Sequence, residues 1–286
     1  MDDPSRRRPL SGDRALIPPG LDATLVLLRH GESEFIVEGR FQGQAETPLS
    51  PAGLRQAELA GRRLARPHAS PSLPVPAGAP LEIVHSPLRR TTQTAQAVAT
   101  AGADPAAFGT PLPLRPDPGF LEIGQGVWEG LHHTEITERY GDTLSAWRRA
   151  PLEAWAPGGE SLPEVQARVR PALATLLGRL ADAGRPGSLD RSQVAGYREP
   201  VEPVDPQPWS LLVAHDGVFK VTLLTLFDLP LDRFWMWLFD LCGISVIEFR
   251  GGRAIARAHN STEHLAPLLD ERAQEASEAR QRTGAL

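Results

Sequence analysis

A chain of 286 residues with 41% apolar side chains can build at least one hydrophobic core, and its formal net charge of −5 gives no reason to expect a nucleic-acid partner. Cys242 is the only cysteine, which excludes an intrachain disulfide and fits a reducing compartment. The first 19 residues lack the apolar core of a signal peptide, and no apolar run is long enough to span a membrane. We therefore expect a cytoplasmic protein.

The first predicted strand is the run Leu25–Leu28, which is followed by Arg29, His30 and the turn residue Gly31. An unbroken apolar run of this length is typical of a strand that is buried on both faces. Arg29 and His30 then lie at its carboxyl end, where open α/β sheets bind ligands. A neutral imidazole there is a nucleophile that works near pH 7, and the adjacent guanidinium can hold a phosphate oxygen.

A helix is predicted after Ser50, which can cap it, with Pro51 at the first helical position. Its buried stripe is expected to consist of Leu54, Ala57, Leu59, Ala60 and Leu64.

The second predicted strand is 81–85, and Ser86 is expected to cap the helix that follows. Arg89 and Arg90 both fall in the first turn of this helix. They point about 100° apart, so only one of them can face a site at the helix amino end.

A further short strand within 112–121 leads to Glu122, and the aromatic-rich segment 124–157 is expected to be irregular. A helix begins after Ser161, since Glu164 three residues later completes a capping box. The next buried strand is 210–214, and His215 stands at its end as His30 does on the first strand.

Strand patterns alternate with helical patterns along the chain, which predicts an α/β sandwich with helices on both faces of the sheet. We expect a flexible tail over 1–20, a single domain over 21–268 with a surface insertion at 184–208, and a second tail over 269–286.

Five motifs occur in a fixed order, and together they resemble the histidine phosphatase superfamily, in its phosphoglycerate-mutase-like branch. They are Arg29-His30-Gly31-Glu32, Ser86-Pro87-Leu88-Arg89-Arg90, Glu122 with Trp128-Glu129-Gly130, Gly158-Gly159-Glu160-Ser161 and Ala214-His215-Asp216-Gly217. The resemblance implies a three-layer sandwich around a six-stranded, mostly parallel sheet with one antiparallel strand. It also identifies Arg90 rather than Arg89 as the phosphate-binding arginine.

The residue types suit hydrolysis of a phosphate monoester through a covalent phosphohistidine on His30. Arg29, Arg90 and His215 would surround the phosphoryl oxygens and stabilise the charge that spreads over them during transfer. Glu122 would give the leaving group its proton, a role that requires a raised pKa. No His, Cys or Asp set has metal-ligand spacing, so we expect neither a metal nor a cofactor.

For the substrate, we expect contacts from Ser33, Arg40, Gln42 and Gly43. Many relatives carry an asparagine six residues after the nucleophile, where this chain has Ile36. The loss of that amide makes the pocket mouth more apolar and puts catalytic efficiency in doubt.

Three functions fit this pattern: a phosphatase for small phosphate monoesters, a cofactor-dependent phosphoglycerate mutase, and a non-catalytic binder of phosphorylated ligands. Mutases usually have an arginine directly after the acid, whereas Ile123 follows it here. We rank the phosphatase first. The expected partner is a small phosphate ester, with no nucleic acid and no membrane, and the sequence leaves a homodimer open.

Overall fold

The computed structural model describes residues 15–184 and 207–268. Most of the predicted 1–20 tail, nearly all of the predicted 184–208 insertion and the whole 269–286 tail lie outside the described residues.

One six-stranded sheet organises the described chain, in the order β3-β2-β4-β1-β5-β6. Its strands are β1 (Ala23–Arg29), β2 (Ile83–His85), β3 (Leu114–Pro116), β4 (Trp209–Ala214), β5 (Ile244–Arg250) and β6 (Arg253–Ser261). Strand β5 runs antiparallel to both of its neighbours, while β1, β2, β3 and β4 pair in parallel. The predicted mostly parallel sheet with one antiparallel strand is confirmed.

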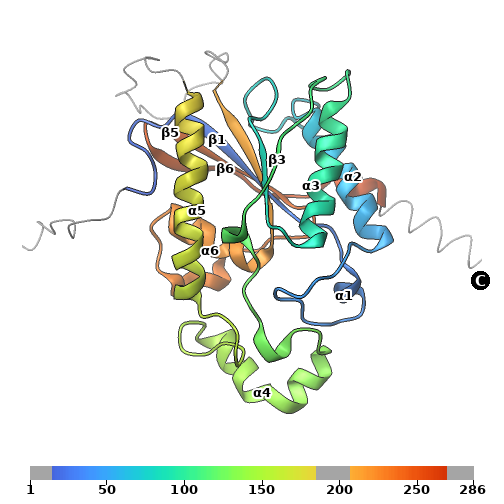
Figure 1. The fold of residues 1–286 in the computed structure, drawn as a ribbon, viewed down its shortest axis with the longest axis vertical. Helices are drawn as coiled ribbons and strands as arrows, with labels where there is room; N and C mark the ends of the chain where they lie inside the picture. The colour runs from blue at the N-terminus through green and yellow to red at the C-terminus, as the bar shows by residue number, and fades with distance from the viewer. Residues whose placement is uncertain (1–14, 185–206, 269–286) are drawn as a thin grey trace, which may run out of the picture.

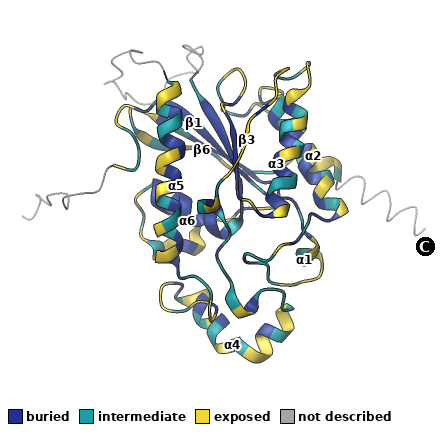
Figure 2. Ribbon diagram, viewed as in Figure 1, coloured by how far each residue is buried: buried dark blue, intermediate teal, exposed yellow. Residues whose placement is uncertain are grey.

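Helices cover both faces of the sheet (Figure 1). Helices α5 (Leu162–Ala183) and α6 (Asp216–Leu226) contribute to one core, and α2 (Pro51–Ala65) and α3 (Arg89–Ala103) contribute to the other. Strand β1 contributes side chains to both cores, because Leu25 and Leu27 pack in the first and Val26 and Leu28 pack in the second. Figure 2 shows the resulting pattern of buried central strands and of helices exposed on their outer sides.

Helix α2 begins as predicted, with Ser50 accepting a hydrogen bond from the Gly53 amide and Pro51 in the first turn. Leu54, however, is 44% exposed, so its predicted place in the buried stripe is wrong. The first turn packs through Gly53, whose Cα hydrogen faces the Glu32 backbone, and Leu54 points about 100° away from that contact.

The prediction of an irregular segment over 124–157 is also wrong, because it contains α4 (His133–Arg149). Helix α4 has a kink at Tyr140 and lies at the end of the molecule beyond the sheet (Figure 1). Only Ile136, Leu144 and Trp147 of this helix are buried, so its apolar stripe is narrow and most of the helix is polar.

The predicted cap on α3 is wrong as well. The helix starts at Arg89 after Leu88, which gives it no side-chain cap. The remaining short elements are α1 (Glu34–Val37), η1 (Pro118–Phe120), η2 (Gly126–Trp128), η3 (Leu231–Met236) and η4 (Glu263–Leu265).

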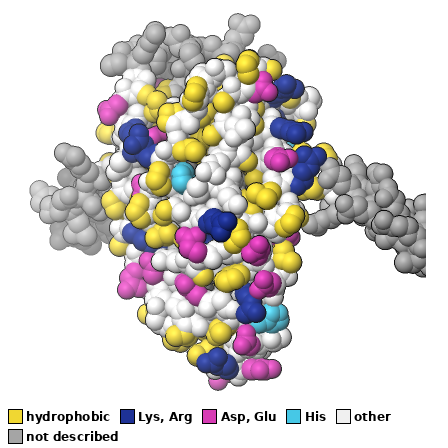
Figure 3. Space-filling view, turned by 45° about the vertical axis from the view of Figure 1, so that its right-hand side comes forward, with side chains coloured by type: hydrophobic (Ala, Val, Ile, Leu, Met, Phe, Trp, Pro, Cys, Tyr) yellow, Lys and Arg dark blue, Asp and Glu magenta, His cyan; other side chains and the backbone are white. Residues whose placement is uncertain are grey.

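Acidic and basic side chains are interspersed over the face of the molecule shown in Figure 3. Within the described ranges, no helix combines the length and apolar character needed to cross a membrane.

Candidate active site

His30 directly follows β1 and is held by backbone contacts on both sides. Its amide donates to the Ala214 carbonyl at 3.0 Å, and its Nδ1 lies 2.7 Å from the Gly31 carbonyl oxygen. A carbonyl can only accept, so Nδ1 carries the proton and Nε2 keeps a free lone pair. Burial, together with the positive charges of Arg90 and Arg29, holds the pKa of His30 well below its usual value. The ring is therefore a neutral nucleophile at pH 7.

His215 takes the equivalent place on the neighbouring strand. Arg29 and Ala214 are paired in the parallel register of β1 and β4, so the next residue on each strand is a histidine. The two ring centroids are 5.0 Å apart, with an interplanar angle of 64°. His215 Nε2 lies 2.9 Å from Ser86 Oγ, and burial lowers the pKa of His215, with Arg90 adding to the effect. Ser86 thus holds the second histidine in place instead of capping α3.

Arg90 is fully buried, and its guanidinium is fixed by backbone carbonyls of the loop after α1. Nη2 donates to Gly43 at 2.8 Å and Nη1 donates to Ala45 at 3.0 Å. Burial lowers the pKa of Arg90 to about 10, which still leaves it cationic at neutral pH. Arg89, the neighbouring residue, is exposed, whereas Arg90 is buried.

Three buried nitrogen atoms around His30 have no hydrogen-bond partner among the described residues: Arg29 Nε, Arg90 Nε and His215 Nδ1. Buried donors are nearly always satisfied, and two of these three belong to guanidinium groups. An anion with several oxygen atoms, such as a phosphoryl group, matches this donor set.

The Glu122 carboxyl group sits at the amino end of α6. Oε1 accepts from the amides of Ile123 at 2.9 Å and Val218 at 3.0 Å, and Oε2 accepts from Gly217 at 3.2 Å. Burial raises the pKa of Glu122, although the amide hydrogen bonds and Arg90 oppose it. A Cβ at Gly217 would lie 2.6 Å from Oε1, so the approach of this carboxyl group requires glycine there.

Of the four residues expected to bind substrate, Ser33, Gln42 and Gly43 contact one another or Arg90, whereas Arg40 lies at the surface. Ser33 is buried and its hydroxyl donates to Gln42 Oε1 at 2.6 Å, which fixes the orientation of the Gln42 amide. Gly43 supports Arg90 through its carbonyl. Arg40 is 40% exposed and is engaged by Glu38 and by the Gly130 carbonyl.

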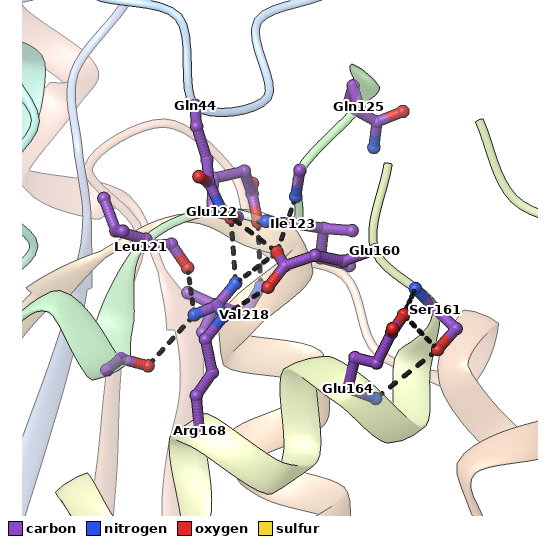
Figure 4. Close-up of polar contacts among 12 residues, drawn as sticks. Gln44, Leu121, Glu122, Ile123, Gln125, Glu160, Ser161, Glu164, Arg168 and Val218 are labelled. Atoms are coloured by element: carbon purple, nitrogen blue, oxygen red, sulfur yellow. Dashed lines mark hydrogen bonds and ion pairs between the residues drawn. The ribbon is translucent and has the colours of Figure 1, made fainter. Parts of the chain in front are cut away.

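Arg168, on α5, is a residue that our reading of the sequence missed (Figure 4). Its guanidinium donates to the carbonyls of Leu121 and Glu122, each at 2.9 Å, and pairs with Glu160 at 2.8 Å. Glu160 also accepts from the Gly124 amide at 2.8 Å. The pair therefore clamps the backbone on both sides of Glu122. The only trace of this pair in the sequence is that the two residues lie eight apart, with Glu160 just before the N-cap of α5 and Arg168 in its second turn.

Over the described part of the chain, no three His, Cys, Asp or Glu side chains gather in a way that could hold a metal ion.

Comparison with known proteins relates this site to a family of enzymes. The family model of the histidine phosphatase superfamily, branch 1, matches residues 25–184 and 199–262. A glucosyl-3-phosphoglycerate phosphatase of Mycobacterium tuberculosis is 34% identical over 207 residues, which cover 72% of this chain and 76% of the relative. Phosphoserine phosphatase 1 of Hydrogenobacter thermophilus is 28% identical over 242 residues, or 84% of this chain and 93% of the relative.

Among solved structures, YhfR of Bacillus stearothermophilus superposes with a TM-score of 0.65 at 26% identity, covering 85% of this chain and 99% of that one. The matched residues include both strand-end histidines, Arg90 and Glu122. The chain belongs to the histidine phosphatase superfamily, branch 1, a family of enzymes that hydrolyse phosphate esters.

Proposed function

We propose that this protein is a phosphatase that hydrolyses small phosphate monoesters in two steps, with His30 as the nucleophile and Glu122 as the general acid. The observation that supports it most directly is the pair of unsatisfied guanidinium donors on Arg29 and Arg90, with the unpaired Nδ1 of His215, beside a neutral His30. These donors suit the oxygens of a phosphoryl group, and the free Nε2 suits attack on its phosphorus.

In the first step, Nε2 of His30 forms a bond to phosphorus as the ester P–O bond breaks. Glu122 transfers its proton to the departing oxygen, so that an alcohol leaves and the carboxylate remains. Arg29, Arg90 and His215 stabilise the charge on the phosphoryl oxygens.

In the second step, water attacks the phosphohistidine. The Glu122 carboxylate takes one proton from that water, inorganic phosphate departs, and both His30 and Glu122 return to their starting states. The Nδ1–H bond to the Gly31 carbonyl keeps the ring oriented through both steps.

The mutase remains a weaker candidate. Ile123, directly after the acid, is buried in the core at 3% exposure and offers no donor to a substrate carboxylate. Water is therefore the expected phosphoryl acceptor. With 3-phosphoglycerate and its bisphosphate primer, free phosphate should form faster than 2-phosphoglycerate, and rapid isomer exchange without phosphate release would favour the mutase.

The two relatives are named for phosphoserine and glucosyl-3-phosphoglycerate, which both carry a carboxylate near the phosphate. We infer that the partner is a small phosphate ester in the cytoplasm. The homodimer that the sequence leaves open stays a prediction.

The test is phosphate release from a panel of esters that includes phosphoserine, 3-phosphoglycerate and nitrophenyl phosphate, with a chelator present. We expect turnover that the chelator does not affect. His30→Ala should lower it by more than about 10³-fold and abolish acid-labile phosphoryl labelling, because the nucleophile is lost. His68→Ala, at an exposed histidine, is the matched control and should keep wild-type activity. Substantial turnover by His30→Ala would refute the mechanism, and no turnover of any ester would favour a binding protein.

A further inference from the structure

Asp216 lies directly after His215 and shares the amino end of α6 with the Glu122 carboxyl group. Asp216 is the first residue of this helix, and the amides of the next two residues donate to Glu122. Two carboxyl groups thus occupy one helix turn beside the nucleophile. The negative charge of Asp216 contributes to the raised pKa of Glu122, after burial.

Lys220 is the only lysine among the 30 Lys and Arg residues of the chain, and it pairs with Asp216 one turn along α6. Its Nζ lies 2.7 Å from Asp216 Oδ2, and the lysine side chain is 5% exposed. The ammonium also lies 5.2 Å from the ring centroid of Phe234 and 4.9 Å from that of Trp235. Aromatic faces stabilise the buried ammonium there, while the Asp216 side chain is 28% exposed.

The second oxygen of Asp216 shows that Lys220 satisfies this carboxylate only in part. Asp216 Oδ1 is buried and receives no hydrogen bond from any described residue. An acidic residue in a first helical turn with a lysine four residues later also stabilises a helix. Helix stabilisation alone does not require that the lysine be buried against two aromatic rings. Nor does it require the Glu122 carboxyl group at the same helix turn.

The charged groups around Glu122 come from three elements, and Asp216 and Arg90 are the two whose charges act on its carboxyl group. Asp216 and Lys220 lie on α6, and Arg90 on α3 exerts an opposing charge on the carboxyl group. Arg168 on α5 contacts the Glu122 backbone carbonyl and is neutralised by Glu160. His30 and His215 are neutral near pH 7 because burial lowers their pKa values. Asp216 is thus the carboxylate that acts on Glu122 from the amino end of α6.

We propose that Asp216 and Lys220 are positioning residues of the general acid: Asp216 keeps Glu122 protonated until phosphoryl transfer, and Lys220 limits this effect by holding the Asp216 carboxylate. The inference rests on the proposed role of Glu122. It makes opposite predictions for the two residues, because one charge disfavours the Glu122 carboxylate and the other favours it.

The test is the pH dependence of kcat/KM for glycerol phosphate, an alkyl ester whose leaving group needs a proton. Activity should fall at high pH as Glu122 loses its proton. Asp216→Asn removes the negative charge at constant size, so this basic limb should move to lower pH by about one unit. Lys220→Met keeps the apolar stem between the aromatic rings, and the limb should move to higher pH.

The double variant Asp216→Asn/Lys220→Met separates charge from damage to the fold. Opposed charge effects cancel, so its basic limb should return close to the wild-type position, whereas structural defects would accumulate. Glu135→Gln removes a first-turn carboxylate from α4 and is the matched control, which should leave the limb in place. Nitrophenyl phosphate provides a second control, because its leaving group needs little help from an acid.

Glu122→Gln is measured alongside to distinguish the two hypotheses. If it retains the basic limb, Glu122 is not the acid and both hypotheses fail. If it loses the limb while Asp216→Asn and Lys220→Met leave it unmoved, or shift it in the same direction, only the inference about the pair is overturned.

Discussion

At the scale of single residues, burial disfavours the charged forms of His30, the proposed nucleophile, and of Glu122, the proposed acid. Burial lowers the pKa of His30 and raises that of Glu122, so both are favoured in their neutral forms. Attack requires the unprotonated imidazole and departure of the alcohol requires the protonated carboxyl. The same buried site therefore favours the protonation state that each of the two groups needs.

Glu122→Gln tests this assignment, since it keeps the size of the side chain and removes the titrating proton. An alkyl alkoxide is a strong base and needs that proton, whereas nitrophenolate leaves readily without it. We expect kcat/KM to fall by about 10²–10⁴-fold for alkyl phosphates and far less for nitrophenyl phosphate. Equal losses on both substrates, with an unchanged pH profile, would make Glu122 a structural residue.

At the scale of elements, the site is assembled where two parallel strands and two helix ends meet. The two histidines follow β1 and β4, and Arg90 lies in the first turn of α3. Amides at the amino end of α6 donate hydrogen bonds to the Glu122 carboxyl group. The segment that carries Glu122 has no regular structure of its own and depends on α5. Arg168 of that helix bonds its carbonyls, and Glu160 bonds its Gly124 amide (Figure 4).

Arg168→Met should therefore weaken both the fold and the acid. Burial raises the pKa of Glu160, but the hydrogen bonds from Arg168 and the Gly124 amide outweigh this and hold it below its usual value. Without the guanidinium, that carboxylate and the backbone carbonyls of Gly119, Leu121 and Glu122 lose their partner. We expect a loss of about 2–3 kcal/mol in the free energy of unfolding, measured with denaturant, and reduced kcat/KM for alkyl esters.

The matched control is Arg233→Met, which breaks an ion pair with Asp232 whose partners are 68% and 60% exposed. Its unfolding free energy should change by less than about 0.5 kcal/mol. Similar losses in the two variants would mean that the Arg168 contacts contribute no more than a surface pair.

At the scale of the whole molecule, the buried histidines make stability depend on pH. Burial lowers the pKa values of five histidines: His30, His85, His215, His259 and His264. Below about pH 6.5 the unfolded chain binds protons that the folded protein does not, so stability falls as the pH decreases. Glu122 acts in the opposite direction because its folded pKa is raised, but it is one group against five.

The His264→Gln variant tests the contribution of one of these five histidines, which lies outside the candidate active site. Burial lowers the pKa of His264 to about 4, so it resists protonation over the whole range from pH 6.5 to 4. In that range the variant's unfolding free energy should depend less steeply on pH, by at most about 1.4 kcal/mol per pH unit. Denaturant unfolding at several pH values measures this, with His68→Gln at an exposed position as the control. An unchanged slope would show that His264 titrates normally in the folded protein.

Local patterns in the sequence predicted much of this structure. The apolar run before Arg29 predicted a doubly buried strand, and Ser161 with Glu164 predicted the capping box that opens α5. The positions of His30 and His215 at two strand ends followed in the same way. These features depend on residues a few positions apart, so side-chain periodicity and capping chemistry suffice to predict them.

Contacts between distant segments were decided only by the tertiary structure. The position of Ser86 beside His215 follows from the pairing of β2 with β4, and the loop carbonyls that hold Arg90 come from 47 and 45 residues earlier in the chain. Helix α4 escaped prediction because few of its residues are buried, and Arg168 because its partners are mostly backbone carbonyls. Any residue can supply a carbonyl, so no side-chain pattern marks it, and its position is set by how strands and helices pack.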